Sequence, residues 1–224
     1  MKDIHVGLIL DGNRRWAKQR KWKPWDGHQE GFEKLKKLLN WIQELKIKEV
    51  SLYCFSIQNF GRVEMEKKHL FDIFRQEIDS LLDDERLEKE QIKVRFAGRI
   101  HLFPEDMQIK MNELMEKTKR YSNYIINFAM AYGGREEIVD TVNKMVKEGQ
   151  SITEESLQAR MWVPENLDLV IRTGNENRTS NFFVWQASYA ELFFLEKMWP
   201  DFEKEDLVMI LDEFNEKRER RFGK

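Results

Sequence analysis

The sequence predicts an α/β protein with a mostly parallel six-stranded sheet and helices on both faces. Six short runs of apolar and branched residues alternate with longer stretches of helical periodicity along the 224 residues. Such alternation is typical of parallel sheets, in which the connecting helices cover the faces. The length suits a single domain over residues 1–224, and we find no internal repeat.

The six predicted strands are runs of five to eight residues. They are rich in Val, Ile, Leu and Phe with little polar alternation, as expected for strands buried on both faces. Their predicted ranges are 6–10, 50–55, 92–97, 124–131, 167–172 and 190–195. The first, second and fifth strands lead directly into polar residues, so candidate functional residues lie at the ends of strands.

The predicted helices lie between these runs, where apolar residues recur every three or four positions. A helix begins near Arg14, and a loop is expected around Pro24 and Gly27. Further helices are expected over 28–45, 64–90, 104–121 and 203–221, with one opened by Gly133-Gly134 that ends near Lys147 and a short one capped by 153–155. Asp83 and Asp84, within the second range, are expected on a solvated helix face.

Charge and cysteine content exclude several classes of protein. The net charge of -2 argues against a nucleic-acid binder held by bulk charge. Cys54 is the single cysteine, so an intrachain disulfide is excluded and a reducing, cytoplasmic compartment is expected. No apolar run approaches the roughly 18 residues that a membrane span needs. The N-terminal stretch is not expected to be a signal peptide.

The first candidate site follows the first predicted strand. Asp11, Gly12 and Asn13 come at the strand end, and Arg14 and Arg15 open the next helix. Ligands of open α/β sheets bind at the carboxyl ends of strands, and helix N-termini favour anions. A carboxylate there can hold Mg²⁺ against a phosphate that the arginines also bind. The alternative is a simple turn with a helix cap.

The second candidate site follows the fifth predicted strand, in the stretch RTGNENRTS. Arg172 and Arg178 are six residues apart and are followed by Ser180. Two arginine forks with nearby hydroxyl groups suit a loop that wraps a diphosphate. The alternative is an exposed polar loop. Gly61, near Arg62, suggests a hinged segment over 57–63 that closes over substrate.

Three long stretches, HVGLILDGNRRWA, RTGNENRTSN and WQASYAELFFLEKMWPD, together resemble the signatures of the cis-prenyltransferases. This is the family of undecaprenyl and dehydrodolichyl diphosphate synthases. The resemblance runs from about residue 5 to residue 223. It implies an enzyme that condenses isopentenyl diphosphate with an allylic diphosphate, forms Z double bonds and uses Mg²⁺. It also implies an apolar tunnel for the growing chain and a homodimer.

The resemblance assigns roles to individual residues. Asp11, Asn13 and His28 are the implied catalytic residues, and Asp11 and Glu191 the implied metal ligands. For Glu191 a plain surface position stays an alternative, as does a helix-surface position for Glu66 and a cap for His28. The implied substrate-binding residues are Gly12, Arg14, Arg15, Trp16, His28, Ser56, Asn59, Phe60, Arg62, Glu66, Arg172, Arg178, Ser180, Arg221 and Gly223. Of these, Arg172, Arg178 and Ser180 match the extender site and Arg15 the allylic site.

The chain departs from the family pattern at two places. Gln58 stands where the family usually has a glutamate, and residues 23–26, directly before Gly27-His28, lack the arginine that the bacterial pattern has a few residues before its Gly-His. Arg14 replaces a glycine of the bacterial version, as in the eukaryotic and archaeal branch, and is expected to take over that phosphate contact. Candidates for the tunnel wall are Cys54, Ile73, Phe74, Ile126 and Phe128, each of which also suits ordinary core.

Alternatives to this function stay open at the level of sequence. They are a catalytically silent partner subunit, a short-chain or irregular prenyl diphosphate synthase on the same fold, and a lipid-binding module. The tail Arg221-Phe222-Gly223 matches an Arg-x-Gly tail that reaches the partner's site in some relatives, and the alternative is an inert helix end. Expected partners are the two diphosphates, a second copy and a peripheral membrane contact, without nucleic acid.

Overall fold

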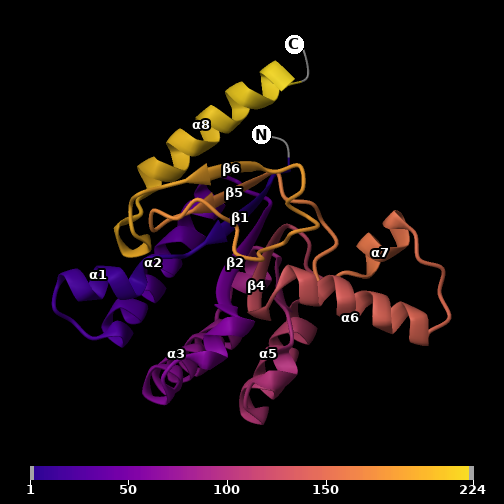
Figure 1. Cartoon of the computed structure of the whole chain (residues 1–224), viewed down its shortest axis with the longest axis horizontal. Helices are drawn as coiled ribbons and strands as arrows, with labels where there is room; N and C mark the ends of the chain where they lie inside the picture. The colour runs from indigo at the N-terminus through magenta and orange to yellow at the C-terminus, as the bar shows by residue number, and fades with distance from the viewer. Residues whose placement is uncertain (1–2, 222–224) are drawn as a thin grey trace.

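The computed structural model describes residues 3–221, with the side chains of 218–221 left out. Its centre is a six-stranded sheet in the order β3-β4-β2-β1-β5-β6, with every neighbouring pair parallel (Figure 1). The predicted sheet is confirmed. The strands are β1 His5–Ile9, β2 Glu49–Ser56, β3 Ile92–Ala97, β4 Tyr124–Tyr132, β5 Leu169–Arg172 and β6 Glu191–Phe194.

The two faces of the sheet are covered differently. One face packs against α2, α3, α5 and α8. The other packs against Val163, Phe182 and Phe183, which lie outside the helices, and is joined to α6 by the hydrogen bond that Tyr132 donates to Glu137. Side chains alternate between the faces, so Leu8 points to the first core and Ile9 to the second. The helices are α1 Asn13–Gln19, α2 Pro24–Glu44, α3 Glu64–Leu82, α4 Arg86–Lys89, α5 Glu105–Thr118, α6 Gly134–Lys147, α7 Glu154–Arg160 and α8 Lys204–Arg221, with 3-10 turns η1 Ile57–Gly61, η2 Ile100–Leu102 and η3 Trp199–Asp201.

The loop predicted around Pro24 and Gly27 is wrong, because α2 begins at Pro24. Proline suits the first helical position, where its missing N–H has no partner to lose. Gly27 lies inside the helix for a tertiary reason. A Cβ there would stand 2.2 Å from the backbone oxygen of Asn13, so only glycine lets α2 cross α1 this closely.

The long helix predicted over 64–90 is interrupted. α3 ends at Leu82, and a short α4 begins at Arg86. Between them the Asp84 carboxylate accepts hydrogen bonds from the Arg86 backbone N–H at 2.9 Å and from its guanidinium at 2.6 Å. Such local bonding of aspartate to nearby backbone competes with helix continuation.

The strand register determines which segments meet at the site. β1 lies between β2 and β5, and Ile9 is level with Tyr53 on one side and Arg172 on the other. The residues that follow these three strands therefore meet at one edge of the sheet. None of the helices among residues 3–221 has the length and apolar character needed to cross a bilayer.

Candidate active site

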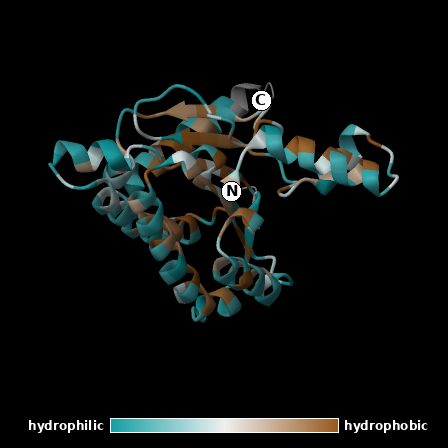
Figure 2. Cartoon of the chain, turned by 60° about the horizontal axis from the view of Figure 1, so that its bottom comes forward, coloured by the Kyte–Doolittle hydropathy of each residue, from teal (hydrophilic) through white to brown (hydrophobic). Residues whose placement is uncertain are grey.

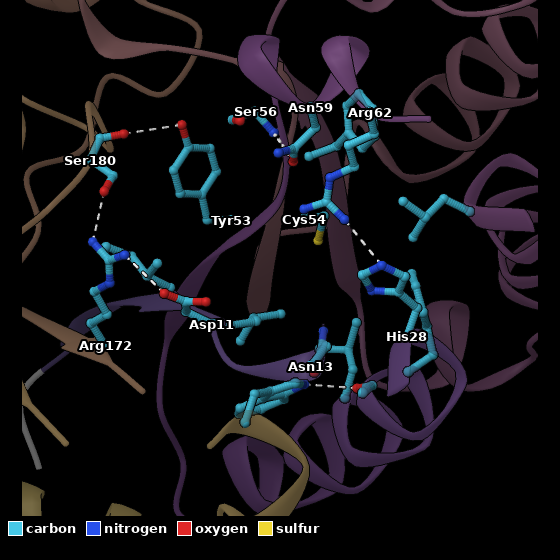
Figure 3. Close-up of a pocket in the computed structure, with 18 residues that line it drawn as sticks. Asp11, Asn13, His28, Tyr53, Cys54, Ser56, Asn59, Arg62, Arg172 and Ser180 are labelled. Atoms are coloured by element: carbon cyan, nitrogen blue, oxygen red, sulfur yellow. Dashed lines mark hydrogen bonds and ion pairs between the residues drawn. The ribbon is translucent and has the colours of Figure 1, made fainter. Parts of the chain in front are cut away.

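Asp11 lies at this edge, two residues after the end of β1, and Figure 3 shows Arg172 pointing toward it. Its Oδ2 accepts a hydrogen bond from Nη2 of Arg172 at 2.9 Å and lies 3.2 Å from Nη2 of Arg15. About a third of the side chain, 32%, is exposed. Gly12 then turns the chain with φ 116°, and a Cβ there would lie 2.9 Å from Met198. The turn therefore needs glycine and leaves the carboxylate accessible.

Arg172, at the end of β5, is buried under the loop that follows it. Its Nη1 donates to the Ser180 hydroxyl at 2.7 Å and to the backbone oxygen of Arg178. Its Nε is buried without a hydrogen-bond partner among the described residues. The Arg178 side chain, in contrast, is 63% exposed and pairs with Glu176 at 2.6 Å. The 172–180 loop thus presents one fixed and one exposed guanidinium.

A second cluster brings together residues from α1, α2 and α3 with Arg62, which follows η1. The Glu66 Oε1 accepts from Nη1 of Arg62 at 2.6 Å and lies 2.9 Å from Nε2 of His28. Nε of Arg14 lies 3.6 Å from the same oxygen. His28 and Glu66 are both buried. Three nitrogen groups that could bind a phosphate therefore converge on one internal carboxylate.

The charge states of this cluster follow from its burial. Burial lowers the pKa of His28, outweighing the opposing Glu66 hydrogen bond, so the ring is neutral. Burial acts to raise the pKa of Glu66, but the His28 hydrogen bond and the nearby Arg62 and Arg14 charges outweigh it and lower that pKa. Since Glu66 is ionised, Nε2 of His28 carries the proton and donates to it. The Arg62 nitrogen 3.0 Å from Nε2 is then a neighbour and not a donor.

Asn13 begins α1 at the floor of the site, and Figure 3 places it between Asp11 and His28. Its Oδ1 is buried and lacks a hydrogen-bond partner among the described residues. Gly31 of α2 packs against it so closely that a Cβ would lie 2.7 Å from Oδ1. An amide that is buried and unsatisfied beside a cavity suits a polar ligand.

The segment after β2 forms a short 3-10 turn over the site. The Ser56 backbone N–H donates to Oδ1 of Asn59 at 3.0 Å, which fixes the turn. Gly61 has open space around it, with no atom within 4 Å of an added Cβ. Phe60 packs away from the cavity among aromatic rings, 5.0 Å from the Phe55 ring and 5.6 Å from the Phe103 ring.

Several residues implied by the family resemblance lie elsewhere. Trp16 is buried, and its Nε1 donates a hydrogen bond to Asp201 at 2.7 Å. Neither Trp16 nor Phe60 lines the cavities described below. Glu191 begins β6 and is level with Leu169 and, through it, with Val6. It therefore lies roughly 16 Å along the strands from Asp11, at the opposite edge of the sheet.

The structure thus does not bring Glu191 and Asp11 of one chain together. A residue at the start of a parallel strand and one that follows the end of another lie at opposite edges. The Arg221 side chain and Gly223 lie outside the described residues.

Three adjoining cavities extend from Asp11. The first, of about 230 Å³, has a polar end and an apolar end, with Asp11, Asn13, His28 and Arg172 at one and Phe32, Leu35, Cys54 and Leu70 at the other. The second, of about 170 Å³, shares Phe32, Leu35 and Cys54 and continues along Phe74, Phe96, Phe128 and Met130. The third, of about 600 Å³, is an outer cleft lined by Arg14, Arg15, Lys18, Trp22 and Arg62.

Some lining residues have no counterpart among the sequence-based candidates. Tyr53 donates its hydroxyl to the backbone oxygen of Ser180 at 3.3 Å and so joins β2 to the arginine loop. Lys18 and Trp22 line the outer cleft. The signal for Lys18 was its spacing, one helical turn after Arg14 and Arg15. For Tyr53 the only signal in the sequence was its position near the end of a predicted strand.

A family model described as putative undecaprenyl diphosphate synthase matches residues 9–223. The chain belongs to this family. The residues that end or follow β1 and β5, Asp11 and Arg172, line the polar end of the first cavity.

Individual relatives agree with the family model. The chain is 42% identical to a tritrans,polycis-undecaprenyl-diphosphate synthase (geranylgeranyl-diphosphate specific) of Pyrococcus abyssi, over 98% of this chain and 86% of that protein. A probable undecaprenyl diphosphate synthase from Campylobacter jejuni has a similar structure, with a TM-score of 0.82 at 31% identity over the whole of both chains. A lavandulyl diphosphate synthase from Lavandula x intermedia gives 0.85 at 32% over 94% of each. This family member is therefore a prenyltransferase that synthesises Z-type prenyl diphosphates.

Proposed function

We propose that this cis-prenyltransferase uses geranylgeranyl diphosphate as its allylic primer and isopentenyl diphosphate as its extender. The primer is the one named for the Pyrococcus abyssi relative at 42% identity. The observation that carries the proposal is the junction at Asp11. There, a cationic cleft that suits diphosphates meets a cavity that becomes apolar, as an isoprenoid tail requires. We take the chain to be one catalytic domain over residues 1–224, working in the cytoplasm.

The donor set at Asp11 fits a magnesium ion shared with substrate. No group of three or more His, Cys, Asp or Glu side chains in the described part of the chain could hold an ion alone. Mg²⁺ typically takes one or two protein carboxylates and completes its shell with phosphates and water. Asp11 would be that carboxylate. When bound, the ion neutralises diphosphate charge and eases departure of the leaving group.

Two sets of cationic groups flank Asp11, and we assign one diphosphate to each. Arg172, Arg178 and Ser180 bind the extender diphosphate, with the buried Nε of Arg172 as a donor left for it. Arg15, Arg14 and Arg62 bind the allylic diphosphate in the outer cleft, which all three line. Holding both substrates in one cleft makes the condensation effectively unimolecular.

The remaining polar residues orient this arrangement. Asn13 offers its buried amide to the allylic diphosphate, and His28 turns its Nε2 proton from Glu66 toward a phosphate oxygen. Gly12 provides the turn, and Ser56 with Asn59 fixes the segment that carries Arg62. We give Trp16 and Phe60 supporting roles, because they pack behind α1 and η1.

The apolar cavities accept the growing chain. They continue from Asp11 past Cys54 to Phe74 and Phe128, and a further cavity of about 50 Å³ is lined by Ile126. Joined by small side-chain movements, they would form the expected tunnel. Ile73 is buried but does not line them.

We further propose a homodimer across the β6 edge of the sheet. Tyr189 and Leu192 there, and Met209 on α8, are large exposed hydrophobic residues. Unpaired sheet edges with apolar side chains are typical of surfaces that a partner covers. The tail from Arg221, the last residue of α8, to Gly223 is assigned to the partner's site.

The test is a product assay. The full chain is incubated with Mg²⁺, labelled isopentenyl diphosphate and, separately, dimethylallyl, farnesyl or geranylgeranyl diphosphate. We expect label in long-chain products, most rapidly with geranylgeranyl diphosphate. Incorporation with none of the primers would identify a silent subunit, and a product formed from dimethylallyl diphosphate alone would identify an irregular synthase. Either result would overturn the proposal.

A further inference from the structure

A cluster of positive charge surrounds the outer cleft. Six basic residues and no acidic one lie between Arg14 and Trp25, in a chain whose net charge is -2. Lys18, Lys21 and Lys23 are exposed, and in the described part of the chain none of their ammonium groups forms a salt bridge. The arginines of the cleft are assigned to the diphosphates. These lysines lie mostly outside the cleft, on the end of α1 and the turn that connects it to α2.

Large apolar side chains stand exposed at the same place. Trp22 is 48% exposed in this turn, and Val63 and Met65 are 73% and 59% exposed where α3 begins. The two segments are neighbours, because the Trp25 ring stacks on His69, one helical turn after Met65, with centroids 4.8 Å apart. We call the three lysines together with Trp22, Val63 and Met65 the mouth rim. Figure 1 shows α1 and its following turn at the left edge, far from α6 and α7.

This combination has the chemistry of a membrane-surface contact. Exposed tryptophan favours the headgroup level of a bilayer, and nearby lysines are attracted to anionic lipids by about 1 kcal/mol each. The lysines alone would suit nucleic acid as well as an anionic membrane. A nucleic-acid partner would not explain why Val63 and Met65 are exposed beside the lysines. We propose that the mouth rim docks the enzyme on an anionic lipid bilayer. The cleft then opens toward the membrane.

The orientation gives the docking a purpose that rests on the proposed function. Geranylgeranyl diphosphate is an amphiphile whose tail lies in the bilayer and whose diphosphate lies at its surface. An enzyme docked by the mouth rim receives this primer at the outer cleft, which Trp22 and Arg62 both line. The tail then passes Asp11 into the apolar cavities, and the diphosphate stays in the cleft.

The experiment is vesicle co-sedimentation of the full chain. Vesicles of phosphatidylcholine alone are compared with vesicles of equal parts phosphatidylcholine and phosphatidylglycerol. We expect binding to the anionic vesicles that weakens as salt is added. In Lys21→Asn with Lys23→Gln, partition should fall about 30-fold, since each lysine is worth roughly fivefold. The matched control, Lys144→Gln with Lys147→Gln, removes the same charge from exposed positions on α6 and should bind as wild type.

Activity on a short, water-soluble primer without vesicles separates this proposal from the assigned reaction. Lys21 and Lys23 stand outside the substrate cavities, so the double variant should keep wild-type turnover there. Equal partition to both vesicle types, or an equal loss in the α6 control, would overturn the docking proposal even if condensation is confirmed. Binding of the wild type to single-stranded DNA and not to vesicles would overturn it as well.

Discussion

At the scale of the residue, the site depends on carboxylates surrounded by cations. Asp11 and Glu66 each contact more than one basic side chain, yet their surroundings differ. Asp11 is partly exposed and open to the cleft, whereas Glu66 is buried behind it. Asp11 can therefore meet an ion and a phosphate, while Glu66 acts by placing other side chains.

Asp11→Asn tests the proposed metal ligand. Asparagine keeps an oxygen that can accept from Arg172 but lacks the charge that attracts Mg²⁺, so kcat should fall about 10²–10³-fold. The free energy of unfolding should change by only about 1 kcal/mol, because the carboxylate is partly exposed and asparagine keeps an acceptor for the two arginines that it contacts. Steady-state kinetics and urea unfolding measure the two quantities. Wild-type turnover at saturating Mg²⁺ would remove Asp11 from the assigned role.

Glu66→Gln tests whether the internal carboxylate positions the allylic site. Without its charge, Arg62 and Arg14 repel each other, and we expect the KM for the primer to rise about tenfold with a smaller loss in kcat. Glu64→Gln is the matched control, since Glu64 is two residues away, is exposed and, within the described residues, forms a salt bridge with Lys67 alone. The KM for isopentenyl diphosphate should stay unchanged. An equal rise for both substrates would contradict the separation of the two sites.

At the scale of the element, the apolar cavities lie between the sheet and the helices α2 and α3. β4 supplies Phe128 and Met130, α2 supplies Phe32 and Leu35, and α3 supplies Phe74. The space is therefore determined by how far two helices stand from one sheet face. Aromatic side chains facing it limit how long a chain can grow.

Phe128→Ala should lengthen the product. The ring lines the second cavity and stacks on Phe96 with centroids 5.4 Å apart, so its removal extends the space for the tail. Removing a large buried side chain costs about 3 kcal/mol or more, and Phe128→Leu is a milder second variant. Phe103→Leu, outside this cavity, is the control. Chromatography of dephosphorylated products reports chain length, and an unchanged distribution in a folded variant would assign Phe128 to ordinary core.

At the scale of the whole molecule, the two edges of the sheet differ in purpose. The carboxyl edge holds the cleft, and the amino edge holds a buried polar network. Nε2 of His5 is 2.7 Å from the Ser51 hydroxyl, and Asn127 donates to Glu49 at 2.7 Å. Burial lowers the pKa of His5 to about 4, and burial raises the pKa of Glu49 to about 7. These groups couple global stability to pH.

The two shifts oppose each other between about pH 4.5 and 6.5. Because the pKa of His5 is lowered, the folded protein loses stability as pH falls below 6.5, the ordinary pKa of histidine. Because the pKa of Glu49 is raised, the folded protein loses stability as pH rises above 4.5, the ordinary pKa of glutamate. We expect the free energy of unfolding of the wild type to be nearly flat there. In Glu49→Gln it should rise with pH by up to about 1.4 kcal/mol per unit. Urea titrations across this range measure it, and a flat profile in the variant would contradict the assignment.

Much of the fold was predictable from the sequence, because local pattern determines local structure. All six strands lie within two residues of their predicted bounds. The predictions were wrong where contacts between residues far apart in the sequence, or local side-chain hydrogen bonds, determine the structure. Gly27 looks like a loop residue, but it lies inside α2 because α1 crosses there. The break after Leu82 depends on the Asp84 and Arg86 contact, which periodicity does not register.

For the site, the sequence by itself determined the two strand-end motifs, since Asp11 comes just after β1, Arg172 ends β5, and parallel strands end at one edge. Only the tertiary structure decided that His28, Arg62 and Glu66 converge, because that depends on how α2 packs against α3. It also placed Glu191 at the far edge, where β6 begins. Short-range pattern determines where a chain turns, but the distance between side chains on different elements depends on packing.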